Sequence, residues 1–178
     1  AQYKDTLQSE LMSSYVYNAS IPLVKSTPKN INTFEPKLSF KMSPHEMRDN
    51  SALERRVDIN NIFSSNRLGM GDSFEAGESI TFGLNFKKER VSIKNEISEI
   101  ERYFNFKLAT VYRFDEEKNI PINSTLNKKR SNIFGRYDFY PTKNLALNYN
   151  FSLTEDLKTF EYNSIIANIN FNNFNTQF

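Results

Sequence analysis

The 178-residue chain contains no cysteine and one histidine, His45. This segment therefore has no disulfide and no thiolate metal site, and it cannot form a multi-histidine metal site or a histidine acid–base pair. The formal charge is only +2, and basic and acidic residues are mixed throughout, unlike the basic surfaces that bind nucleic acid. Glycine is sparse, and the Gly69-Met70-Gly71 stretch does not form a phosphate-binding loop. The sequence predicts no enzyme activity, no cofactor, no metal and no nucleic-acid partner.

Long hydrophobic runs are also missing. No apolar stretch approaches the ~20 residues of a membrane-spanning helix, and no signal peptide opens the chain, which indicates mature or partial sequence. The hydrophobic fraction is 38%, yet aromatic residues reach 14%, all of them Phe and Tyr. A water-filled barrel has this composition because only its outer face is apolar. A soluble β-sandwich or lipocalin-like barrel has it too, so composition leaves both classes open.

Apolar and polar residues alternate with a period of two, the pattern of β-strands with one apolar face. Phe34, Leu38 and Phe40, for example, alternate with charged or hydroxyl residues. The repeat predicts about seven strands, each close to the ~9–11 residues that cross an outer membrane at a tilt. These strands are expected near residues 15–23, 34–42, 80–86, 104–112, 133–139, 145–153 and 165–171.

Full charges lie on the polar faces of these strands, at Lys37, Lys41, Lys107, Arg136 and Asp138. Burying them inside a small, dry barrel is costly, so that architecture is excluded. A sandwich with a solvated face and a large barrel with a hydrated lumen both remain.

The lengths of the connections between strands distinguish the sandwich from the large barrel. Short turns are expected at 27–30 and 141–144, and long polar loops at about 44–79 and 114–130. Short turns at one end and long loops at the other are typical of membrane barrels. Aromatic residues beside the second turn, among them Tyr137, Phe139 and Tyr140, are placed where an aromatic girdle is expected. The fold class we predict is all-β, an antiparallel meander whose curved sheet forms part of a large transmembrane β-barrel.

Three sequence patches resemble the LPS-assembly protein D (LptD, organic-solvent-tolerance protein) family, in its C-terminal outer-membrane barrel domain. The central patch carries a loop motif, and the others resemble the hairpin before it and a strand start after a long loop. The central residues are Asn61-Ile62-Phe63, Asn66-Arg67-Leu68, Asp72, Glu75, Gly77 and Phe82-Gly83-Leu84; the others are Ile21-Pro22-Leu23-Val24-Lys25 with Phe34-Glu35-Pro36-Lys37, and Ser131-Asn132-Ile133-Phe134-Gly135. The chain departs from the family at Met70, where glycine is usual, and at Ser73, which replaces an arginine.

The resemblance implies a segment of a lipopolysaccharide (LPS) translocon in the outer membrane of a Gram-negative bacterium. It implies LPS, membrane lipid, an LptE-like lipoprotein plug in the lumen and periplasmic LPS bridge proteins as partners. The bridge proteins would act through an N-terminal domain that this chain lacks. We expect residues 1–178 to be one partial barrel domain of about seven to eight strands. Alternatives are another outer-membrane barrel, such as a porin or receptor, and a soluble β-sandwich binding module.

Two groups of residues are candidate site residues. The family-motif loop holds Asn66, Arg67, Asp72, Glu75 and Gly77. Within it, Arg67, Asp72 and Glu75 either form an ion-paired loop that helps to seal the lumen or belong to a rim loop without lipid contact. The second group is basic and predicted to face the lumen, where it contacts LPS phosphates or the plug, or is only hydrated. This group is Lys37, Lys41, Lys107 and Arg136. Gly69, Gly71 and Gly77 are expected to adopt positive φ.

Overall fold

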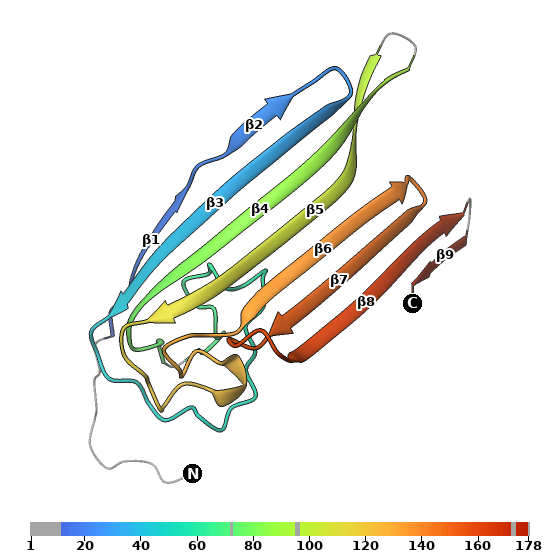
Figure 1. Ribbon diagram of the computed structural model, residues 1–178. Helices are drawn as coiled ribbons and strands as arrows, with labels where there is room; N and C mark the ends of the chain where they lie inside the picture. The colour runs from blue at the N-terminus through green and yellow to red at the C-terminus, as the bar shows by residue number, and fades with distance from the viewer. Residues whose placement is uncertain (1–11, 72, 95–96, 172–173, 178) are drawn as a thin grey trace.

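The computed structural model describes residues 12–71, 73–94, 97–171 and 174–177. These residues form a single antiparallel sheet of nine strands in the order β1-β3-β4-β5-β6-β7-β8-β9, with β2 beside β3 (Figure 1). The elements are β1 (Tyr15–Ser20), β2 (Leu23–Ser26), β3 (Asn30–Ser43), β4 (Gly77–Lys94), β5 (Ile97–Arg113), the 3-10 turn η1 (Ile122–Ser124), β6 (Ile133–Thr142), β7 (Leu145–Leu153), β8 (Phe160–Phe171) and β9 (Phe174–Gln177). The prediction of an all-β antiparallel meander is confirmed, and the sheet is not closed within this segment. Among the described residues, no helix is long and apolar enough to cross a membrane.

The two faces of the sheet differ in solvent exposure, and in the opposite sense to a soluble protein. On β3, Leu38 is 41% exposed, whereas its neighbour Ser39 is 4% exposed. On β4, Phe82 is 51% exposed and Thr81 only 2%. The apolar face is therefore the open one, and part of the polar face is covered. No second sheet packs on the apolar face in the part of the chain described, so this segment does not build a β-sandwich.

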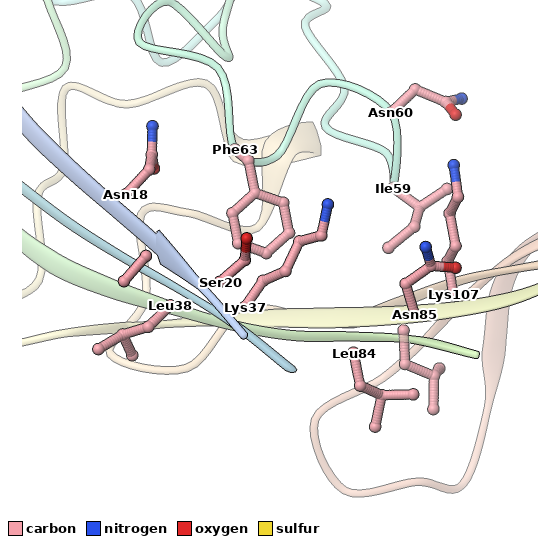
Figure 2. Close-up of a pocket in the computed structure, with 12 residues that line it drawn as sticks. Asn18, Ser20, Lys37, Leu38, Ile59, Asn60, Phe63, Leu84, Asn85 and Lys107 are labelled. Carbon is pink, nitrogen blue, oxygen red and sulfur yellow. The ribbon is translucent and has the colours of Figure 1, made fainter. Parts of the chain in front are cut away.

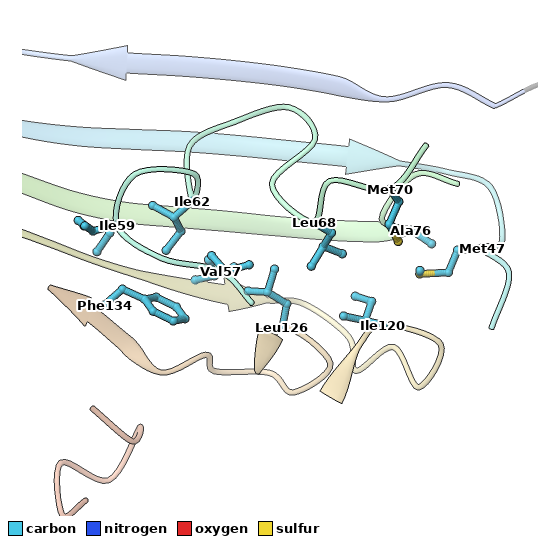
Figure 3. Close-up of a cluster of buried hydrophobic side chains, with 12 residues drawn as sticks. Met47, Val57, Ile59, Ile62, Leu68, Met70, Ala76, Ile120, Leu126 and Phe134 are labelled. Carbon is cyan, nitrogen blue, oxygen red and sulfur yellow. The ribbon is translucent and has the colours of Figure 1, made fainter. Parts of the chain in front are cut away.

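The cover on the polar face consists of the two long loops, residues 44–76 and 114–132, which gather at one end of the sheet (Figure 1). A compact apolar core lies between these loops and the ends of β5 and β6 (Figure 3). Its members are Met47, Val57, Ile59, Ile62, Leu68, Met70, Ala76, Ala109, Val111, Ile120, Leu126 and Phe134. Most of them belong to the loops, which are therefore packed structures, although the sequence indicated only that they are long and polar.

The opposite end of the sheet carries the short turns, and both predicted turns are present. The first joins β2 to β3, and the second joins β6 to β7 around Lys143 and Asn144. The β4–β5 hairpin extends beyond its neighbours at this end (Figure 1). Pairing of β5 with β6 covers only Phe104 to Ala109, and an irregularity in β5 leaves Tyr103 without a partner on β4. This end is therefore built mainly from one long hairpin.

Candidate functional site

A buried cluster of four charges lies where the first loop meets the sheet. Arg67 forms a two-pronged ion pair with Glu75, with Nε to Oε2 at 2.7 Å and Nη2 to Oε1 at 2.5 Å. The same carboxylate accepts from Lys41 Nζ at 3.2 Å and from Arg113 Nη1 at 2.5 Å. All four side chains are at most 5% exposed. Three cations thus surround one carboxylate.

The cluster joins three separate parts of the chain. Arg67 and Glu75 belong to the 44–76 loop, Lys41 lies near the end of β3, and Arg113 ends β5. The remaining donors are also satisfied: Arg67 bonds the hydroxyl groups of Ser79 and Thr81 on β4 at 2.8 and 2.9 Å. Lys41 and Arg113 donate to backbone carbonyl groups of Ser65, Ala76 and Asp115. Separating the partners of a buried ion pair leaves an uncompensated charge, which is costly. The cluster therefore holds the loop firmly against the sheet.

The ionisation of Glu75 follows from these neighbours. Burial by itself raises the pKa of the carboxyl group, because water no longer solvates its charge. The charges of Arg67, Lys41 and Arg113, with the hydrogen bonds from Arg67, outweigh burial and lower the pKa of Glu75 from 4.5 to about 2. Glu75 is therefore ionised at neutral pH, and it accepts hydrogen bonds rather than acting as a proton donor.

Two other motif residues shape the loop around the cluster. Asn66 brackets Met70: its amide nitrogen donates to the Met70 carbonyl at 2.7 Å, and its amide oxygen accepts from the Met70 N–H at 3.1 Å. Gly77 begins β4 with φ of 80°, and a Cβ there would lie 2.8 Å from Arg113 Nη2. The expected positive φ is found at Gly69 and Gly77 but not at Gly71. Asp72 lies outside the described residues.

A groove of about 450 Å³ separates the tip of this loop from the polar face of the sheet (Figure 2). Phe63 and Ile59 hang over it from the loop, and Lys37, Asn85 and Lys107 rise into it from the strands, while Leu38 and Leu84 point to the other face (Figure 2). Next to it lies a second, more basic hollow of about 370 Å³. Its polar lining includes Asn60, Lys87, Arg102, Lys107, Arg136 and Asp138.

Positive charge is only partly balanced in these hollows. Lys107 pairs in register with Arg136 across β5 and β6, so two cations lie directly opposite each other. Arg136 bonds Asp138 at 2.7 Å and Lys37 bonds Glu35 at 3.3 Å. Within the described ranges, Lys107 makes neither a hydrogen bond nor an ion pair. An anion entering here therefore meets at least one unpaired ammonium group.

The predicted basic group thus divides in two. Lys37, Lys107 and Arg136 line the hollows, whereas Lys41 is buried against Glu75 and Ser65 and does not face them. Sequence reasoning missed Arg113, since it lies 38 positions from Glu75 and no local pattern links them. It also missed Phe63 as the loop residue that packs over Gly83 of β4, although Phe63 belongs to the quoted motif.

The described residues contain no group of three or more His, Asp or Glu side chains arranged to hold a metal ion. A profile of the family described as LptD, LPS transport system D, matches residues 2–178 of the chain. A search of curated proteins gave no significant match.

Proposed function

Because the chain belongs to the LPS transport system D (LptD) family, whose role is LPS transport to the outer membrane, we propose that it forms one wall of an outer-membrane barrel. The observation that carries this proposal is the reversed amphipathic pattern of the sheet. Phe82 and Ile165, on the open face, are 51% and 71% exposed, while Ser79 and Thr81 on the covered face are nearly inaccessible. In water this arrangement is unfavourable, since apolar surface gains about 25 cal/mol per Å² on leaving water. Lipid on the apolar face and water on the other remove the conflict.

Strand length supports the same assignment. β4, β5 and β8 are 18, 17 and 12 residues long, enough for the ~9–11 residues of a tilted membrane strand. Among the described residues the sheet is open, and its outermost strands, β1 with β2 on one side and β9 on the other, pair along one edge only. We place residues 1–178 within a larger barrel domain, whose other strands pair with these edges, with a periplasmic domain elsewhere in the protein.

In this arrangement the two packed loops close the lumen next to this wall at its long-loop end, which is the cell exterior in outer-membrane barrels. The buried Glu75 cluster holds them there. They act as a fixed cap and not as solvated rim loops, because the two loops share one core with β5 and β6. The chain's own contribution is passage and support, and we assign it no catalytic step.

The basic hollows beneath the cap are the proposed contact with substrate. LPS carries phosphate groups, and charge-assisted hydrogen bonds to phosphate are among the stronger polar contacts. Lys37, Lys107 and Arg136 offer such donors on the lumen side, and Lys41 does not. A lipoprotein plug of the LptE kind, seated in the lumen, is the other partner that this face would take.

The experiment is crosslinking in cells. A photoreactive amino acid replaces Lys107 or Arg136 in the full-length protein, and adducts are identified by mass. The matched control replaces Leu108, which neighbours Lys107 on β5 and belongs to the opposite face. We expect LPS adducts from the lumen positions, and from Leu108 adducts to the acyl chains of membrane phospholipid.

Adducts from Lys107 and Arg136 to a lipoprotein, with none to LPS, would overturn the substrate contact and leave this wall as a support for the plug. Equal labelling from Leu108 and Lys107 by soluble proteins would contradict the membrane assignment itself.

A further inference from the structure

The apolar face carries a continuous group of aromatic rings at the short-turn end of the sheet. Phe104 contacts Phe86 and Tyr137, with ring centroids 5.8 and 4.8 Å apart. Phe139 contacts Tyr137 at 6.3 Å and Tyr103 at 5.4 Å. The group therefore runs across β4, β5 and β6, and Tyr103 lies at its outer limit. We call these five residues the aromatic collar.

Tyr103 belongs to the collar only because of the irregularity in β5. Lys88 pairs with Phe104 and Glu89 with Arg102, so Tyr103 is an extra residue with no partner on β4. Strict alternation from Phe106 would turn Tyr103 to the lumen. The bulge instead places its ring beside Phe139 on the apolar face, which is the re-aiming of a side chain that bulges commonly produce.

Two cations cover the Tyr103 ring. The Arg90 guanidinium carbon lies 3.6 Å from the ring centroid and Lys88 Nζ lies 5.7 Å from it. Among the described residues, neither cation forms an ion pair. Glu101 is opposite Arg90 in register, but it pairs with Lys143 at 3.0 Å instead. Two positive charges therefore border an apolar surface with only an aromatic ring as partner.

The collar also lies at a suitable distance from the other end of the apolar face. Tyr112 and Phe114 form a second aromatic pair there, 6.1 Å apart, and both are about two-fifths exposed. Tyr103 through Tyr112 is ten residues of β5, which matches the ~9–11 residues of a membrane-crossing strand. Aromatic girdles flank the apolar band at both interfaces of such strands.

We propose that Lys88, Arg90 and Tyr103 form a binding site for the phosphate headgroup of a membrane phospholipid. Its acyl chains lie along the collar residues Phe86, Phe104 and Tyr137. The site belongs to the leaflet at the short-turn end, and the β4–β5 hairpin beyond Arg90 projects out of the membrane. This inference rests on the proposed membrane function, but it adds a lipid site centred on Arg90 and Tyr103 at the apolar face. Lys88 and Phe104 lie at its border with the second hollow, which they also line.

The test uses the full-length protein in cells whose lipids carry ³²P. A photoreactive amino acid is placed at Phe104, in the wild-type background and in a Lys88→Gln, Arg90→Gln double variant. A second probe at Leu38, in the middle of the apolar face, reports insertion in the membrane independently. Lys87→Gln is the matched control, because Lys87 pairs in register with Asn105 on the polar face and forms an ion pair with Glu89. Lys88 instead pairs in register with Phe104, and its Nζ lies beside the Tyr103 ring.

We expect a phospholipid adduct at Phe104 that falls about fivefold for each cation removed, with no change for Lys87→Gln or for the Leu38 probe. Undiminished labelling at Phe104 in the double variant, with the Leu38 probe still labelled, would overturn the headgroup site alone. A protein adduct at Phe104 would do the same, in favour of a periplasmic partner. Loss of lipid labelling at Leu38 in the wild type would instead contradict the membrane function.

Discussion

At the residue scale, Glu75 is the residue on which the loop structure depends most. Its carboxylate is the single anion among three buried cations, and every donor around it is directed to it or to a fixed oxygen. A buried ion pair is weak evidence for stability as a whole, but the loss of one member is costly because its partners stay charged. The loop should therefore respond strongly to any change at this position.

We predict that Glu75→Gln loosens the 44–76 loop at neutral pH. Glutamine has nearly the same shape but leaves Lys41, Arg67 and Arg113 without a counter-charge, a loss of roughly 3–5 kcal/mol. The measurement is limited proteolysis of the detergent-solubilised protein, with cleavage sites mapped by mass. Glu78→Gln is the control, since Glu78 is exposed and its change should stay within about 0.5 kcal/mol. Equal protease resistance of both variants would contradict the prediction.

Acid should reproduce the effect in the wild-type chain. The pKa of Glu75 is lowered on folding from 4.5 to about 2, so its ionised form stabilises the folded loop. That contribution is complete above pH 4.5 and is lost as the pH falls through about 2. In Glu75→Gln this acid-dependent step should be missing.

At the scale of elements, the 44–76 loop is fastened to the sheet by packing as well as by charge. The Phe63 ring lies over Gly83 of β4, where a Cβ would come within 2.5 Å of Phe63 Cζ and 3.2 Å of the Leu108 carbonyl oxygen. Glycine in a strand interior commonly marks such a close approach. Because Gly83 has no side chain, the Phe63 ring of the loop can contact the backbone of β4 at this point.

We predict that Gly83→Ala displaces the loop and costs about 1–3 kcal/mol, as overpacking typically does. The loss should appear as easier proteolysis of the loop, while the sheet keeps its circular dichroism. Adding Phe63→Ala removes the clash, so the double variant should lose less than the sum of the two single changes. Gly71→Ala is the control, as nothing lies within 4 Å of a Cβ there. Strict additivity would contradict the proposed contact.

At the scale of the whole molecule, the distribution of polarity is opposite to that of a soluble protein. The core of the described residues is a small loop-and-strand cluster at one end, and most of the sheet has an open apolar face. That face carries many large exposed side chains, among them Tyr17, Phe82 and Ile165. Contiguous apolar surface of this kind marks an interaction site in a folded protein.

We predict that the isolated chain stays dispersed only in detergent or lipid. The apolar face and the free edges of the outermost strands, which are templates for further strand pairing, should drive aggregation once detergent is removed. Size-exclusion chromatography with light scattering, before and after detergent removal, measures this, and transfer into lipid nanodiscs is the control. A monomer in plain buffer would contradict both the membrane assignment and this prediction.

The period-two alternation determined the strands, their turns and, for most residues, the face of the sheet to which the side chain points. These features depend on residues that neighbour each other in the chain. Leu38 and Phe40, for instance, take the face that the pattern indicates, and the loop motif contains both Arg67 and Glu75, which form an ion pair. What the sequence did not decide is non-local. Arg113 and Lys41 meet Glu75 only when β3, β5 and the loop assemble. The apolar loop residues have no regular spacing, so their shared core was not visible.

The bulge at Tyr103 has the same origin. Whether an extra residue is accommodated in β5 depends on its pairing with β4, and that pairing reverses the faces taken by the β5 residues from Ser98 to Arg102. Arg102 consequently lines the lumen hollow and Tyr103 joins the collar. Alternation predicts the face of each side chain only where the register between strands is regular. The register is a property of a pair of strands, so one strand's sequence alone does not determine it.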